Sequence, residues 1–238
     1  MKLMNPSPTL LRARNNFEIF DDFLNYVTTD LWTSDTTDDN DVAPAVGDAE
    51  HGILTLSATT DDNEETGVFS TRELALFQAD CTMVFETRLQ YAEAATSAAN
   101  VAVGMCDAPN IDDWITDNGG ALATSGSGMA IYKLDGGTVW RGNVEINGTV
   151  KDDASTQTAG SASYVRLTLE ARAVDATNLE VMYFLDDLPL LLSTGRPILH
   201  TIAYASATEM NLQLYLKIGS TTTETVLVDY VYYGCTRV

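Results

Sequence analysis

Four runs in the last third of the chain alternate between apolar and polar residues or are apolar throughout, and they constrain the fold more than any other feature. They are residues 164–170 (YVRLTLE), 180–190 (EVMYFLDDLPL), 210–218 (MNLQLYLKI) and 225–232 (TVLVDYVY). A period of two places every second side chain on one face of a strand, and turn-forming Gly, Asp, Asn, Ser or Pro residues close the runs. The runs therefore predict successive strands with no helix between them.

Similar patterns occur along the rest of the chain. In residues 82–90 (TMVFETRLQ), one face of the predicted strand carries Met83, Phe85, Thr87 and Leu89, while the other carries charged side chains. We expect about twelve to fourteen strands, with turn signals about every 8–12 residues, which is typical of a two-sheet sandwich. The predicted fold is all-β, an antiparallel jelly-roll sandwich of two packed sheets.

Weaker signals mark other segments. We expect a hairpin turn at 135–137 (DGG), loops at 28–48 and 154–163, a short helix at 107–117, and a strand within 68–77 with Phe69 and Leu74 turned inward. No internal repeat or linker divides the body. We therefore expect one sandwich domain at 17–238, preceded by a short extended arm at 1–16.

Acidic residues greatly outnumber basic ones. The 238 residues include 34 Asp and Glu against 13 Lys and Arg, which gives a net charge of −21. Such a surface repels phosphate groups and anionic lipids, so we expect no binding to nucleic acid or to membranes. The same charge favours solubility.

The N-terminal arm has the opposite charge. Residues 1–17 contain Lys2, Arg12 and Arg14 and no acid, so the rest of the chain carries −24. A basic leader on an acidic body is typical of a docking arm for an acidic partner, and a frayed terminus is the alternative.

Cysteine is sparse and the chain has no export signal. Cys81, Cys106 and Cys235 provide no paired disulfide framework, and we expect the first two in the core and the third partly exposed. The N-terminal residues contain no apolar stretch of signal-peptide length, and no run approaches 18 apolar residues. The sequence therefore predicts synthesis in a cytoplasm without ordinary export.

Three segments carry a resemblance to a known family. Residues 67–90 (GVFSTRELALFQADCTMVFETRLQ), 163–190 (SYVRLTLEARAVDATNLEVMYFLDDLPL) and 226–233 (VLVDYVYY) resemble the paired strands, central hairpin and final strand of concanavalin A-like lectins and glucanases, including the laminin G-like domains. The resemblance spans roughly residues 50–235 and implies a jelly-roll sandwich.

The resemblance also suggests a role. Domains of this family without catalytic residues resemble capsid decoration (cement) proteins of tailed phages. That likeness implies a structural virion protein, made in the host cytoplasm, on the outer surface of the capsid. Its partners would be the major capsid protein and further copies of itself, as a trimer. The expected capsid contacts are the arm residues Leu10, Leu11, Arg12 and Arg14.

An enzymatic role is not expected. Retaining glucanases of this fold carry the pattern E-[IL]-D-x-x-E, because one carboxylate attacks the sugar while the other donates a proton. The nearest stretch is 144–148 (VEING), where Asn147 replaces the second acid and no third carboxylate follows. A glucanase is therefore the least favoured alternative.

Metal binding is a weaker possibility. The acidic runs at 38–41 (DDND) and 61–65 (DDNEE) contain oxygen ligands suited to Ca²⁺, but neither has EF-hand spacing. Solvated acidic loops are the commoner explanation, so no metal ligand and no cofactor is assigned. His51 and His200 lack metal-ligand spacing and are expected at the surface or satisfied in turns.

The tryptophans support a second class of function. Trp32, Trp114 and Trp140 could stack on sugar rings, as in a carbohydrate-binding module or adhesin. Anchoring in the core or in a loop is the commoner role of such residues. Trp114, in the acidic stretch DDWITD, is the first candidate for ligand stacking.

Overall fold

The computed structural model describes residues 16–24, 26–27, 30–35, 42–47, 52–59, 62–79, 81–93, 99–107, 114–115, 126–204 and 209–236. Within these residues the chain forms sixteen β-strands and no helix, so the all-β prediction is confirmed and the number of strands exceeds the expected range. No helix in this part of the chain could cross a membrane.

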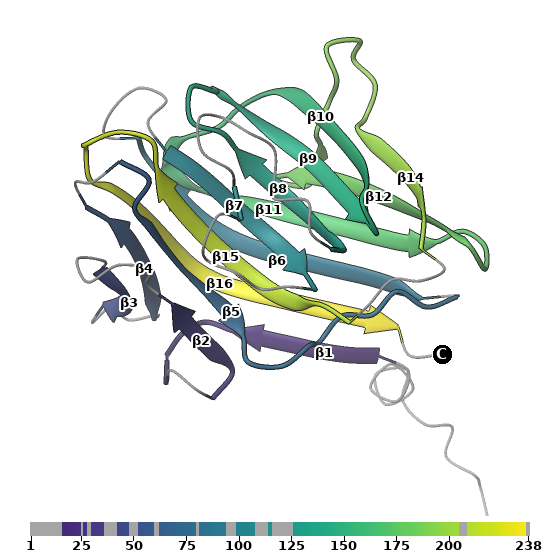
Figure 1. Ribbon diagram of the computed structural model, residues 1–238, viewed down its shortest axis with the longest axis horizontal. Coiled ribbons are helices and arrows are strands. Elements are labelled where there is room, and N and C mark those ends of the chain that lie inside the picture. The colour runs from purple at the N-terminus through teal and green to yellow at the C-terminus, as the bar shows by residue number, and fades with distance from the viewer. Residues whose placement is uncertain are drawn as a thin grey trace, which may run out of the picture.

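The strands form two antiparallel sheets that lie one over the other as a sandwich (Figure 1). The nine-stranded sheet has the order β13 (Leu188–Pro189), β12 (Asn178–Leu185), β11 (Ser161–Ala173), β6 (Thr82–Tyr91), β16 (Glu224–Thr236), β4 (Ile53–Ala58) and β3 (Val42–Gly47), with β1 (Asn16–Asp21) paired to β16 and β14 (Leu199–Ala203) paired to β12. The seven-stranded sheet has the order β10 (Thr149–Thr158), β9 (Val139–Ile146), β8 (Gly128–Lys133), β7 (Ala99–Cys106), β15 (Asn211–Ile218), β5 (Glu65–Ser70) and β2 (Trp32–Asp35).

The main core lies between the two sheets. Strand β6 shows how the alternating sequence produces this core. Its buried residues Met83, Phe85, Thr87 and Leu89 alternate with more exposed residues, as predicted. The fully buried aromatic residues include Trp32 and Trp140, whose core role is thereby confirmed. Burial of these side chains, at about 25 cal/mol per Å² of apolar surface, is the dominant stabilising contribution.

Tight turns set the register of the hairpins. Gly136 has φ +71° in the predicted turn between β8 and β9, and Asn147 and Gly148 have φ +49° and +77° between β9 and β10. Successive positive φ values are typical of the turns whose twist matches antiparallel strands. The hairpin at 135–137 is confirmed by the antiparallel pairing of β8 with β9 on either side of this turn.

Two predicted loops are wrong. Residues 28–48 include β2 and β3, and residues 154–163 include the end of β10 and the start of β11. Strands β2, β3 and β10 lie at sheet edges, where polar side chains on both faces remain solvated. The polar composition of β2 and β10 therefore resembled that of loops, whereas β3 is apolar but contains Pro44, which is typical of turns and edge strands.

Strand β5 also differs from the prediction. Val68 points into the main core and Leu74 packs against it, but Phe69 lies on the opposite face of the sheet. The expected inward position of Phe69 is wrong because β5 begins at Glu65 and residue 69 falls out of phase with Val68.

Two predictions lie mainly outside the described residues. These are the helix at 107–117, of which Asp107, Trp114 and Ile115 are described, and the arm at 1–16, of which Asn16 is described as the first residue of β1.

Candidate functional site

The outer face of the seven-stranded sheet brings together polar side chains from several neighbouring strands. The strand registers place these residues in three rows across β9, β8, β7 and β15. Directly opposed residues on one face of an antiparallel pair are near neighbours, about 5 Å apart. The rows are Glu145, Gly128, Cys106 and Asn211; Asn143, Ala130, Gly104 and Gln213; and Arg141, Tyr132, Ala102 and Tyr215.

The middle of this face forms a shallow depression because β7 and β8 present small residues there. A Cβ atom added to Gly104 would lie 2.0 Å from the carbonyl oxygen of Met129, so only glycine fits there. Ala102 and Ala130 extend this depression between the larger side chains of β9 and β15. The side chains of Trp114 and Ile115 fill the depression.

Trp114 and Ile115 pack in a second apolar cluster with Ala102, Ala130, Tyr132 and Tyr215. The Trp114 ring meets the Tyr215 ring edge-to-face, with centroids 5.9 Å apart and planes at 84°. Trp114 is 6% exposed and Ile115 is fully buried. This placement favours the anchoring role of Trp114, and ligand stacking by Trp114 stays a prediction.

A polar network borders the cluster on the β10 side. Asp152 of β10 accepts hydrogen bonds from the Tyr132 hydroxyl, from Arg141 Nε at 3.1 Å and from Asn143 Nδ2 at 3.2 Å. Burial, followed by the hydrogen bond to Asp152, raises the pKa of Tyr132. The phenol therefore stays protonated and acts as a donor at neutral pH.

Glu145 is the most unusual residue on this face. Its side chain is 5% exposed, and its Oε1 atom has no hydrogen-bond partner among the described residues. Burial raises the pKa of Glu145, and the nearby charge of Asp107 raises it further. A buried carboxyl beside a second acid can donate a proton or share a cation.

Asp107 is held near this end of the sheet by the backbone. It follows β7, and its N–H donates to the carbonyl oxygen of Ser127 at 2.9 Å. Glu145 and Asp107 are two carboxylates at this end of the sheet that could contribute to a cation site. No group of three or more His, Cys, Asp or Glu side chains suited to a metal gathers in the described part of the chain.

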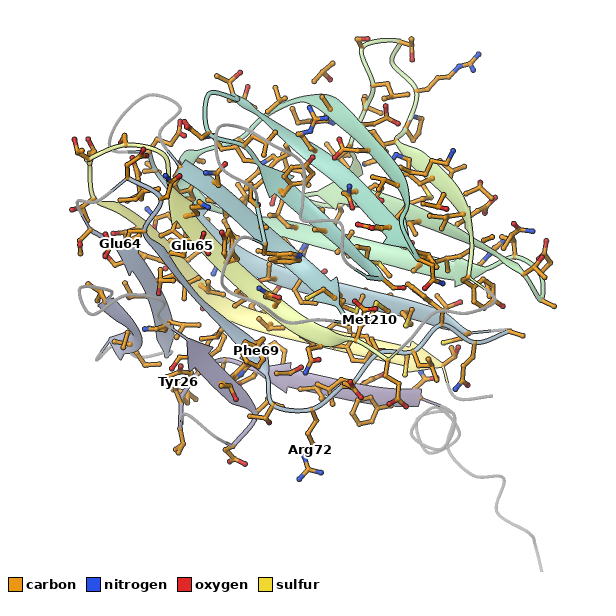
Figure 2. All side chains as sticks on the ribbon, in the orientation of Figure 1. Tyr26, Glu64, Glu65, Phe69, Arg72 and Met210 are labelled. Atoms are coloured by element: carbon orange, nitrogen blue, oxygen red, sulfur yellow. The ribbon has the colours of Figure 1, made fainter. Side chains whose placement is uncertain are left out.

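The opposite side of the face holds a buried ion pair. Lys217 Nζ lies 2.7 Å from Glu65 Oε1, and both side chains are almost fully buried. Glu65 and Phe69 lie along β5 beside β15 (Figure 2). Nearby, the Cys106 thiol donates to Gln213 Oε1 at 2.8 Å, so the polar groups of this face are largely engaged within the protein.

The acidic run at 61–65 is partly structural. Glu64 accepts hydrogen bonds from the backbone N–H of Thr59 at 2.6 Å and from the Thr59 hydroxyl at 2.9 Å, and Glu65 pairs with Lys217. The second run, 38–41, lies outside the described residues. Ca²⁺ binding therefore stays a prediction.

The histidine expectation is wrong for His200. This residue is buried in β14, where its Nδ1 lies 2.9 Å from the Tyr183 hydroxyl and its Nε2 lies 3.1 Å from Asp153 Oδ2. Sequence spacing cannot reveal the contact because Asp153 and His200 belong to different sheets. His51 lies outside the described residues.

The cysteines and the predicted arm contacts are the other residues that the sequence singled out. Cys81 and Cys106 are buried and Cys235 is half-buried, as expected. Leu10, Leu11, Arg12 and Arg14 lie outside the described residues. The proximity of Glu145 to Asp107 was not predicted from the sequence, because it depends on the position of β8 between β9, which carries Glu145, and β7, which Asp107 follows.

The glucanase pattern itself is not reproduced. The outer positions of β9 are occupied by Val139, Arg141, Asn143 and Glu145, and the next same-face residue, Asn147, lies in the turn. Among the described strands of the seven-stranded sheet, none carries two carboxylates two residues apart on its outer face.

No protein-family model and no curated protein matches the sequence. Solved structures do match. An endo-1,3-beta-glucanase from Streptomyces sioyaensis is 14% identical, with a TM-score of 0.60 over 100% of both chains. Peanut lectin is 12% identical, with a TM-score of 0.56 over 93% of this chain and 97% of the lectin chain.

A third structure, a protein of unknown function from Shewanella oneidensis MR-1, is 12% identical, with a TM-score of 0.54 over 100% of this chain and 96% of that one. At such identities the likeness concerns the fold alone. The chain therefore has the concanavalin A-like jelly-roll fold that is found in glucanases and lectins.

Proposed function

We propose that the protein is a non-catalytic structural module, a virion decoration (cement) protein that binds the outside of a phage capsid. The observation that supports this most is the packing of Trp114 and Ile115 on the low centre of the outer sheet face. These side chains occupy the space that a ligand on this face would need. The sandwich then serves as a scaffold, and its contacts are made elsewhere.

Charge supports the arm as the contact element. The body carries −24, whereas the arm carries Arg12 and Arg14 beside Leu10 and Leu11. A basic and apolar segment can order on contact with an acidic, apolar partner surface. Three copies around a threefold point would give each copy equivalent contacts with the major capsid protein.

Cosedimentation with purified capsids tests this function. Deletion of residues 2–16 is expected to abolish association with the shells, because the proposed contact residues are removed. Circular dichroism and thermal melting provide the control that the sandwich still folds. A folded truncated protein that binds shells at the occupancy of the full chain contradicts the role of the arm.

Carbohydrate binding is the second candidate. It is favoured by the position of Trp114 on the same sheet face as Glu145, a buried carboxyl with an unpartnered oxygen. A glycan array with and without Ca²⁺, repeated with Trp114→Ala, tests this role. A glycan signal that the substitution removes would support a lectin-like module, and release of reducing sugar from β-glucan would support a glucanase.

A further inference from the structure

A pocket of about 460 Å³ opens at the end of the sandwich where β1 begins and β16 ends. Its apolar wall includes Phe17, Leu74 and Leu76, and Cys235 also lines it. Two acids, Glu73 and Glu209, also line it, together with Ala75, Gln78, Cys81 and Thr236. This volume is within the range of ligand-binding pockets, and the pocket combines apolar surface with negative charge.

Backbone hydrogen bonds bring the two acids together. The N–H groups of Leu74 and Ala75 donate to the carbonyl oxygen of Met210 at 2.8 Å and 3.1 Å, and the Met210 N–H donates to the carbonyl oxygen of Ala75 at 2.7 Å. The segment after β5 therefore runs beside the segment before β15. This pairing places Glu73 next to Glu209.

The pair lacks a basic partner in the described part of the chain. A hydrogen bond with Glu209 is the main cause that raises the pKa of Glu73, and the charges of Glu209 and Asp107 raise it further. Neither glutamate takes part in an ion pair among the described residues. Arg72 points away from the molecule (Figure 2). A cation with an apolar portion would therefore complement the pocket.

The chain contains such a segment directly before the pocket. Residues 1–15 hold three basic residues and no acid, and they are followed by Asn16, which pairs with Thr236, and then by Phe17. Figure 1 shows the start of β1 next to the end of β16. At about 3.3 Å per residue, Arg14 can reach about 10 Å from Phe17 and Leu10 about 23 Å.

We propose that this pocket binds the chain's own segment 10–14, with Leu10 and Leu11 on the apolar wall and Arg12 and Arg14 beside Glu73 and Glu209. Charge complementarity favours this occupant, and so does the short connection, which gives the arm a high effective concentration at the pocket. The inference concerns the free protein and does not rest on capsid binding.

Thiol labelling of the full chain tests the inference. Cys235 and Cys81 both line the pocket, but Cys81 is buried whereas Cys235 is half-buried, so the maleimide reaction rate of Cys235 reports whether the pocket is occupied. Both R12E/R14E and E73Q/E209Q are expected to accelerate Cys235 labelling at least about threefold, because a released arm exposes the thiol. The matched controls, K2E in the arm and E170Q on an exposed strand position, are expected to keep the wild-type rate.

Equal labelling rates in all five proteins would overturn the proposal. The proposal would also be overturned if protection of Cys235 depended on protein concentration and if E73Q/E209Q lost an oligomer that the wild type forms. The arm of a second copy would then fill the pocket.

A synthetic peptide of residues 1–15 provides a second measurement on protein lacking residues 2–16. Fluorescence anisotropy should show binding that E73Q/E209Q weakens about fivefold to tenfold and that added salt also weakens. Equal affinity of the peptide for the unsubstituted protein and for the E73Q/E209Q variant would contradict the proposal. Neither measurement involves capsids, so failure of this inference is distinguishable from failure of the proposed function.

Discussion

At the scale of single residues, the buried Lys217–Glu65 ion pair contributes to the stability of the outer sheet face. Both charges are buried, and their mutual attraction offsets part of the cost of removing them from water. Lys217→Met is expected to lower the free energy of unfolding by about 3–5 kcal/mol, because Glu65 stays buried without its counter-charge. Urea denaturation measures this loss.

The double variant K217M/E65L is the control for that prediction. It removes both charges and is expected to be nearly as stable as the wild type. If the single and double variants lose the same stability, the pair is not an isolated electrostatic unit.

Trp114 allows a second residue-scale prediction. If it anchors the apolar cluster against Tyr215, Trp114→Ala removes a large buried side chain and should cost about 3 kcal/mol in the free energy of unfolding. Trp114→Phe retains most of the packing and should cost less than about 1.5 kcal/mol. Unchanged stability in W114A, with loss of a glycan signal, would instead favour ligand stacking.

At the scale of elements, strand alternation was predictable where one face is buried. In β6 the buried positions fall on every second residue, so the sequence pattern and the structure agree. In β10 most side chains are exposed or half-buried on both faces, so no alternation marks the strand. The contacts of Glu145 and His200 were not predictable because they depend on which strands become neighbours.

The turn between β9 and β10 gives an element-scale prediction. Gly148 has φ +77° and Gly47 in β3 does not, although an added Cβ atom meets nothing within 4 Å at either position. Gly148→Ala should cost about 1–2 kcal/mol in the free energy of unfolding, because an L side chain disfavours this backbone region. Gly47→Ala is the matched control and should be neutral or stabilise by up to about 1 kcal/mol. Equal effects in thermal melts would contradict the role of the turn.

At the scale of the whole molecule, His200 links the two sheets. It lies in β14 of the nine-stranded sheet, hydrogen-bonded to Tyr183 of β12, and it contacts Asp153 in β10 of the seven-stranded sheet. Burial lowers the pKa of His200, and this effect outweighs the opposing influence of Asp153 and Asp152. The unfolded chain therefore binds more protons at this histidine than the folded chain does.

The consequence is a specific pH dependence. The stability that comes from neutral His200 is complete above the unfolded pKa of about 6.5 and declines as the pH falls below it. Melting temperatures of the wild type and His200→Gln, measured between about pH 5 and 8, should differ least at the acidic end. A difference that is constant across this range would contradict the prediction. The comparison with H200Q cancels the pH effects of the many surface acids.

At this scale the central proposal is the role of the sandwich as a structural component of a virus particle. Its most direct test, once the source genome is known to be that of a phage, is the protein content of purified particles, measured by quantitative mass spectrometry and located by electron cryo-microscopy. The account predicts a fixed number of copies for each particle, with a β-sandwich on the outside of the capsid. Absence of the protein from intact particles would contradict it.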